Sequence, residues 1–175
     1  MNLTHWPPGI SKHVELPATS LYYNLEVSAT RYPDRPATLY YGGVLRYSDL
    51  KSEVDSLAGF LQQHCGVRRG DRIALYMQNS PQFIIAMHAI LRADAMVVPI
   101  NTMNLGKEVA HIVRDSGARV AIFGQELAAN IQPLLGAELK HGIAATYSDY
   151  IDPGTDLPLP DIVSATAVEI QGAIA

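Results

Sequence analysis

Hydrophobic residues recur at helical spacing in two stretches of the first half of the chain. The first stretch predicts a helix that begins at Thr19 or Ser20, whose hydroxyls suit an N-cap, and ends before Pro33. The second predicts a helix capped by Ser48 and ended by Gly66. The positions expected to face the core are Leu21, Leu25, Ala29 and Tyr32 in the first helix, and Leu50, Val54, Leu57, Leu61 and Cys65 in the second.

Two short runs of strand-forming residues lie between these helices. They cover residues 37–41 and 44–47, and Gly42-Gly43 lies between them. Because glycine tolerates positive φ, this arrangement predicts a tight antiparallel hairpin.

From Gly70 onward, continuous apolar runs alternate with amphipathic stretches. The runs at 73–77, 96–100 and 120–123 predict strands, and a fourth strand is expected at 143–147. These alternate with helices, one starting at the Ser80-Pro81 signal, one ending at Gly117 and one over 126–135 that distorts near Pro133. The helix after Ser80 is expected to bury Phe83, Ile84, Met87, Ile90 and Leu91. The predicted fold is α/β: a mostly parallel sheet of βαβ units covered by helices, preceded by a small β-hairpin.

Composition shifts along the chain suggest its domain boundaries. Residues 1–18 are rich in proline without apolar periodicity, which predicts an irregular arm before an α/β subdomain over 19–150. Residues 151–161 include the run DPGTDLPLPD, typical of a linker. The small apolar residues of 162–175 then look like the truncated start of a next segment, so we expect a longer natural protein.

Composition and charge exclude several classes of protein. The 175 residues are 48% hydrophobic, which suits one packed domain with a tail. A formal net charge of -4 gives no basic footprint for nucleic acid. The single cysteine, Cys65, excludes an internal disulfide and a four-cysteine zinc site, and it is expected to be buried. With neither a signal peptide nor an apolar run long enough to span a membrane, a cytoplasmic protein is expected.

Three polar turns follow the predicted strands, at residues 78–80, 101–106 and 124–125. Ligands of parallel sheets gather at the carboxyl ends of strands, so these turns are the candidate binding rim. The alternative is that Asn79, Ser80 and Asn104 only cap helices. No glycine-rich dinucleotide fingerprint or phosphate loop is present, which disfavours an unrelated doubly wound nucleotide-binding domain. No histidine pair, metal site or catalytic constellation is found either.

The amino-acid sequence of the central segments closely resembles that of a known protein family. The stretch GVRRGDRIALYMQNSPQFIIAMHAILRADAMVVPINTMNLGKEVAHIVRDSGARVAIF is similar to the N-terminal part of adenylate-forming acyl-CoA synthetases, the AMP-binding enzymes, and to long-chain fatty acid–CoA ligases among them. The lead-in RYPDRPA and the segment LRYSDL fit the same pattern. The resemblance covers roughly residues 21–123.

The resemblance implies a ligase that activates a carboxylic acid, such as a fatty acid, with ATP and Mg²⁺. An acyl-adenylate forms, and the acyl group passes to CoA or to a carrier-protein thiol. The family's Thr/Ser/Gly-rich phosphate loop ending in Pro-Lys-Gly, its adenine and ribose motifs and its catalytic lysine would all lie beyond residue 175. The fragment is therefore expected to be inactive alone and to bind none of these cofactors. It is expected to contact the downstream subdomains of the same chain, and the resemblance does not decide whether it forms a homodimer.

Three residues depart from the family pattern. Asp94 stands where relatives commonly have glycine, Thr102 where they commonly have proline, and Met103 where some have a basic residue that contacts CoA. The resemblance thus places CoA near Asn101, Met103 and Asn104, and it implies no catalytic or metal-binding residue in this chain. The alternative function is a non-catalytic binding or interaction module, in which the linker and apolar tail serve as a docking segment.

Overall fold

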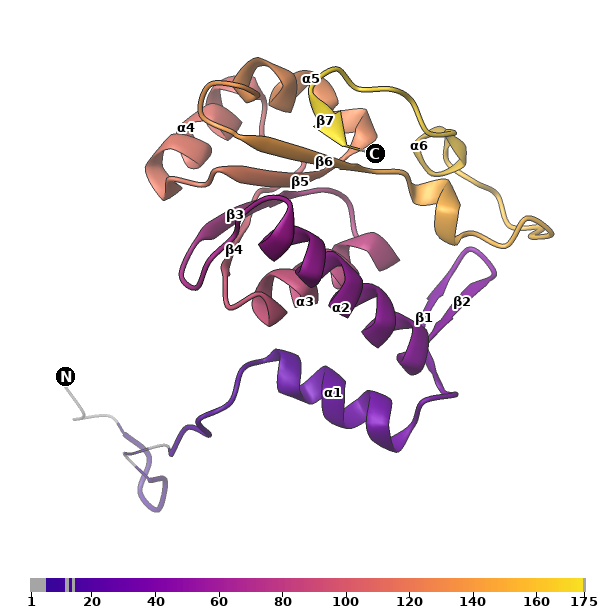
Figure 1. Cartoon of the computed structure of the whole chain (residues 1–175). Coiled ribbons are helices and arrows are strands. Elements are labelled where there is room, and N and C mark those ends of the chain that lie inside the picture. Colours follow the sequence, from indigo (N-terminus) through magenta and orange to yellow (C-terminus); the bar gives the residue numbers. More distant parts are fainter. Residues whose placement is uncertain (1–5, 12, 14, 175) are drawn as a thin grey trace.

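The computed structural model describes residues 6–11, 13 and 15–174 (Figure 1). Its centre is a parallel sheet with strand order β4-β3-β5-β6-β7. The strands are β3 (Arg72–Tyr76), β4 (Met96–Pro99), β5 (Val120–Gly124), β6 (His141–Ala145) and β7 (Ala173–Ile174). This confirms the predicted α/β class, with β6 lying two residues earlier than expected.

Helices cover the two faces of the sheet, as Figure 1 shows. On one face lie α2 (Tyr47–Gln63) and α3 (Pro81–Arg92), with α1 (Tyr22–Arg31) packed outside them. On the other lie α4 (Gly106–Ser116) and the short α5 (Ala128–Ile131). Side chains alternate along β3, so Ile73 and Leu75 join the first core and Ala74 and Tyr76 the second. As predicted, the helix around Pro133 is distorted: α5 gives way to a 3₁₀ turn over Gln132–Leu134.

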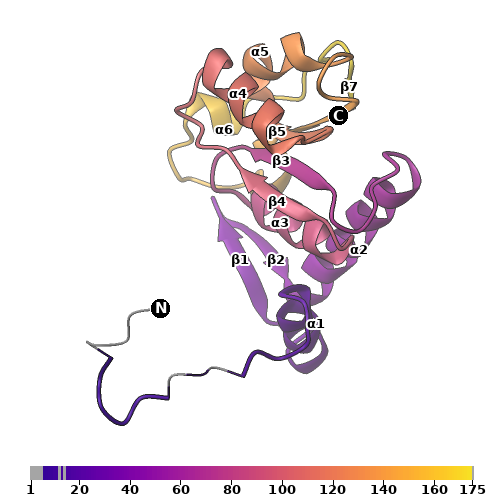
Figure 2. The ribbon, with the colours of Figure 1, turned by 90° about the vertical axis from the view of Figure 1, so that its left-hand side faces the viewer.

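The predicted hairpin is confirmed as β1 (Pro36–Tyr40) and β2 (Gly43–Arg46). Figure 2 shows this ribbon beside α2, separate from the main sheet. Its turn lies one residue earlier than expected, at Tyr41 and Gly42, both with positive φ. Gly43 instead belongs to β2, where a Cβ would lie 2.0 Å from the carbonyl oxygen of Tyr150.

Two predicted N-caps are wrong. Helix α1 begins at Tyr22 without a side-chain cap, because the Ser20 carbonyl already accepts the Tyr23 amide at 3.1 Å. Helix α2 begins at Tyr47, one residue before the expected cap. The amides of Tyr47 and Ser48 donate to the carbonyls of Arg35 and Pro33, so backbone groups of the loop before β1 replace the side-chain cap. By contrast, Ser80 caps α3 as predicted, its Oγ accepting from the Phe83 amide at 3.2 Å.

The buried face of α3 also differs from the prediction. Ile90 is buried as expected, but Phe83, Ile84, Met87 and Leu91 are half-buried. Their place is taken by Ile85, Ala86 and Ala89. Ala86 and Ala89 belong to the core between α3 and the sheet, and the bulkier Phe83, Ile84 and Met87 pack against that core while partly exposed. In α1, Tyr22 is buried, while Leu21 and Tyr32, expected to face the core, are exposed.

The strand β4 forms one edge of the sheet and is not covered on both faces as predicted. Met96 is 46% exposed, because no strand pairs beyond it among the described residues. Asp94, in the turn before β4, has a φ of 58°, in the left-handed region that favours glycine. This explains why glycine suits the position.

The segment after β6 returns to the sheet. A 3₁₀ turn (Tyr147–Tyr150), an irregular stretch and α6 (Asp161–Ser164) lead to β7, which pairs with β6. Val163 and Ile170 are buried. Residues 1–5, 12 and 14 of the expected N-terminal arm lie outside the described residues, and the predicted domain boundaries stay predictions. No helix in the described part of the chain has the length and apolar character that a bilayer crossing needs.

Candidate functional site

The parallel sheet brings the three predicted polar turns together at its carboxyl edge. They follow β3, β4 and β5, which point the same way and are neighbours in the sheet. Thr102 Oγ1 donates to Gln78 Oε1 at 3.4 Å, which links two of the turns directly. The turn after β6 joins them at the same edge.

A buried hydrogen-bond network runs beneath this edge. The Tyr147 hydroxyl accepts the Gln78 amide at 2.9 Å and donates to Glu126 Oε1 at 2.9 Å. Tyr147 has no exposed surface. Its burial raises the pKa of the phenol far above the ordinary value, despite the opposing hydrogen bond from the Gln78 amide. The hydroxyl therefore stays protonated and keeps donating to the carboxylate.

The second carboxylate oxygen of this network is an open acceptor. Glu126 Oε2 is buried and accepts no hydrogen bond from the part of the chain that the structure describes. It lies against Gly124, where an added Cβ would be 2.4 Å from Oε2 and 2.2 Å from the Tyr147 hydroxyl oxygen. Only glycine leaves room for both groups, so the end of β5 is shaped around the Tyr147–Glu126 pair.

Gln125 ties the C-terminal segment to the same edge. Its Oε1 accepts from Thr146 Oγ1 at 3.2 Å and from the Val168 amide at 3.1 Å. Its Nε2 donates to the Thr166 carbonyl at 3.0 Å. These contacts occupy Oε1 twice and one of the two Nε2 hydrogens, so Gln125 holds the C-terminal segment against the sheet.

The loop expected near CoA is held by its own backbone. Asn101 Oδ1 accepts the Met103 amide at 2.9 Å, and the Asn104 carbonyl accepts the Tyr76 hydroxyl at 2.6 Å. The Met103 side chain is 83% exposed. The helix that follows is capped at Leu105 through Glu108, so Asn104 is not its cap. The loop is therefore fixed in place while the Met103 side chain remains free.

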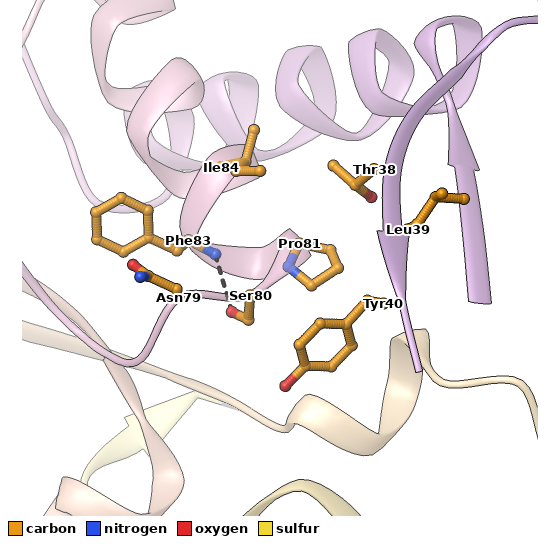
Figure 3. A pocket seen from close by; sticks show the side chains of 8 residues that line it. All are labelled: Thr38, Leu39, Tyr40, Asn79, Ser80, Pro81, Phe83 and Ile84. Atoms are coloured by element: carbon orange, nitrogen blue, oxygen red, sulfur yellow. Dashed lines mark hydrogen bonds between the residues drawn. The ribbon is translucent and has the colours of Figure 1, made fainter. Parts of the chain in front are cut away.

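Two cavities open beside the rim. One, of about 450 Å³, is lined by residues that include Gln78, Asn101 and Thr102. The other, of about 360 Å³, lies between the hairpin and the start of α3 and is drawn in Figure 3. Asn79 and Phe83 line both cavities. Of the three residues expected near CoA, only Asn101 lines either of the two.

Sequence reasoning found the three turns but missed Glu126 and Tyr147. The available signals were Gly124 at the end of an apolar strand and a tyrosine ending the last predicted strand. The chain has no phosphate loop. Within the described residues, no three His, Cys, Asp or Glu side chains gather as metal ligands.

Comparisons with known proteins agree with this architecture. The AMP-binding enzyme family matches residues 25–161. The long-chain-fatty-acid–CoA ligase of Salmonella typhimurium LT2 is 34% identical over 133 residues, covering 75% of this chain and 24% of that protein. The crotonobetaine/carnitine–CoA ligase of Salmonella paratyphi A is 30% identical over 138 residues, covering 76% of this chain and 26% of that protein.

A solved structure shares the fold. The inhibitor-bound N-terminal domain of FACL13 from Mycobacterium tuberculosis superposes with a TM-score of 0.67 at 28% identity, covering 72% of this chain and 33% of that one. The chain spans about a quarter of the length of the curated relatives it matches. With a family match over most of its residues and a fold that agrees, the chain belongs to the AMP-binding enzymes and corresponds to their N-terminal region.

Proposed function

We propose that this chain is the leading part of an ATP-dependent acid–CoA ligase that works through an acyl-adenylate. The observation that carries the proposal is the carboxyl edge of the sheet, where the polar turns after β3 and β4 line two cavities within the segment that matches the family. In this role the chain supplies walls and hydrogen-bonding groups. The phosphate-binding and lysine chemistry belongs to segments beyond residue 175.

The loop 101–104 is the part we propose to lie beside CoA. Asn101 lines the 450 Å³ cavity, and the exposed Met103 thioether offers an apolar contact where some relatives carry a cation. Asn104 holds the loop through the hydrogen bond that its carbonyl accepts from Tyr76. The contact to CoA would therefore be apolar at Met103 and polar at Asn101.

We propose a fatty acid as the carboxylic acid substrate. Support comes from relatives named for long-chain fatty acids at 34% identity. Another relative is named for crotonobetaine and carnitine, so the acid varies within the family. A panel of acids that differ in chain length and charge would test this choice, and a preference for a short charged acid would contradict it.

The decisive experiment compares two lengths of the protein. The reading frame is sequenced past the Ala175 codon, and the 175-residue chain and the continued product are both assayed for acid-dependent ATP–pyrophosphate exchange. We expect the frame to reach a phosphate loop ending in Pro-Lys-Gly and only the longer product to catalyse exchange. Exchange by the 175-residue chain alone, or a stop codon at its end, would contradict the proposal.

A second function is favoured by apolar side chains that stay exposed on the hairpin. Leu39 is 74% exposed and Val44 is 53% exposed. Exposed apolar patches promote association. If the frame stops at Ala175, a non-catalytic interaction module becomes the better proposal. Light scattering then tests it: concentration-dependent association is expected, and a strictly monomeric chain would count against it.

A further inference from the structure

The amino edge of the sheet carries a row of cations in register. Ile73, Val120 and His141 are aligned across β3, β5 and β6, which are consecutive neighbours. The residues one position earlier, Arg72, Arg119 and Lys140, therefore lie in a line across the ends of three adjacent strands. Adjacent strands are about 4.8 Å apart, so the outer two backbones are separated by about 10 Å.

These three cations have no ion-pair partner within the described part of the chain. The ion pairs there join Asp55 to Lys51 and Arg92, and Arg114 to Glu138. Asp71 lies nearby, but its Oδ2 accepts the Arg68 amide at 2.8 Å and so serves its own turn. Three like charges held side by side repel one another, and a bound anion would remove that cost.

The cations border a cavity of about 600 Å³, which is larger in volume than the two cavities described at the carboxyl edge. Cys65, Val67 and His141 contribute to its wall, together with Arg72, Arg119 and Lys140. His141 Nε2 is buried, and residues 6–11, 13 and 15–174 offer it no hydrogen-bond partner. The cavity thus combines three cations with one unused ring nitrogen that can donate once protonated.

We propose that this amino-edge pocket binds a compact anion with two linked phosphate groups. Arginine and lysine bind phosphate oxygens through charge-assisted hydrogen bonds, and a diphosphate is long enough to contact more than one strand end of the row. The chain as a whole carries a net charge of -4, and only three of its Lys and Arg residues line this pocket, which favours a small ligand over a nucleic acid. The site lies at the opposite edge from the proposed CoA loop and does not depend on the proposed ligase activity.

The pKa of His141 provides a measure of anion binding that is separate from the binding affinity. Its burial, together with the adjacent Lys140, lowers the pKa of the imidazole. Arg72, Arg119, Asp71 and Cys65 line the same cavity. An anion bound among these groups favours the imidazolium, so the pKa of His141 is expected to rise on binding.

The test is isothermal titration of inorganic pyrophosphate into the 175-residue chain, without divalent cations and at constant ionic strength. Orthophosphate and sulfate are titrated in parallel. Arg119→Gln and Lys140→Gln are each expected to weaken pyrophosphate binding about tenfold. The matched control is Lys107→Gln, an exposed cation of α4 outside the cavity, which is expected to change affinity less than about twofold.

Several results would overturn the proposal. Pocket variants that behave like Lys107→Gln would show that the cations do not bind the ligand. Equal affinity for orthophosphate and pyrophosphate would overturn the diphosphate class. A His141 pKa, followed by NMR, that does not rise with saturating pyrophosphate would place the anion elsewhere. All the substituted side chains are exposed, so melting temperatures close to that of the unsubstituted chain are expected, and Arg72→Gln replaces any variant that does not fold.

Discussion

The two ends of the same sheet carry opposite chemistry. At the carboxyl edge, Gln78, Glu126 and Tyr147 satisfy one another through hydrogen bonds, with a single carboxylate oxygen left open. At the amino edge, Arg119 and Lys140 lie beside each other without ion-pair partners in the described part of the chain. Parallel alignment gathers the strand ends in both places, but the polar side chains at the carboxyl edge hydrogen-bond one another, whereas the row of cations at the amino edge has no ion-pair partner in the described part of the chain.

The difference gives opposite signs to substitutions at the two edges. Removing a partner at the carboxyl edge leaves a buried group unsatisfied, which is costly. Removing a cation at the amino edge relieves repulsion, which is mildly favourable in the absence of a ligand. Substitutions at the carboxyl edge should therefore lower the melting temperature, and removal of a cation at the amino edge should leave it unchanged or raise it slightly.

The largest effect is expected for Gly124→Ala. The added Cβ collides with the Tyr147 hydroxyl and the Glu126 carboxylate, so the pair must separate. We expect a loss of about 3 kcal/mol in the free energy of unfolding, or a fall in melting temperature of about 6–12 °C. Gly59→Ala is the control, because it lies within α2 with no atom within 4 Å of the added Cβ. An unchanged melting temperature for Gly124→Ala would show that the network is loose.

Tyr147→Phe comes next. It removes the hydroxyl that joins the Gln78 amide to Glu126 and leaves both groups unsatisfied. A loss of about 2 kcal/mol is expected, measurable by denaturant unfolding. The control, Tyr23→Phe, removes the hydroxyl of a tyrosine that is 48% exposed and is expected to be neutral. Equal losses in the free energy of unfolding for the two variants would show that the hydrogen bonds of the Tyr147 hydroxyl do not stabilise the fold.

A smaller effect is expected from His141 as the pH falls. The folded-state pKa of His141 is lowered, so the unfolded chain binds the proton more readily. Above the ordinary pKa of about 6.5, His141 is neutral in both states and does not change the free energy of unfolding. As the pH falls below that value, the unfolded chain gains the proton first, so the free energy of unfolding decreases until the folded state is protonated too. His141→Asn should flatten the loss of melting temperature between pH 8 and pH 5. The exposed His111, changed to Asn, is the control, and an equal flattening by both variants would contradict this assignment.

The smallest effect is expected for Arg119→Gln without ligand. Removing one charge of the row should raise stability by about 0.3 kcal/mol at low salt, and the gain should vanish near 0.5 M salt. Precise calorimetry at the two salt concentrations would measure it. A loss of stability at low salt would show that Arg119 has a favourable partner, and the contrast between the edges would then fail.

Local pattern determined much of what the structure shows. The apolar runs at 73–77 and 120–123 became β3 and β5 within one residue, because a strand buried on both faces needs continuous hydrophobicity. Ser80-Pro81 marked the start of α3, because an N-cap hydroxyl accepts the amide three residues further along the chain, here that of Phe83. Cys65 is buried as its place on an apolar helix face predicted.

What failed depended on neighbours distant in sequence. The amide partners at the start of α2 come from the loop before β1, so Ser48 was not needed as a cap. The buried face of α3 is the one that packs with α2 and the sheet, and it carries Ile85, Ala86 and Ala89. In both cases the contacts with another element, which the local sequence does not show, decided the outcome.

The sequence by itself determined the alternation of strands and helices and the three polar turns, since hydrophobic period and turn chemistry are local properties. Only the tertiary structure joined Gln78 to Tyr147, which is 69 residues away, and aligned Arg72, Arg119 and Lys140 at the opposite edge. Strand order and register decide which side chains meet. Both are set by how the helices pack on the two faces of the sheet, and no short stretch of sequence encodes that packing.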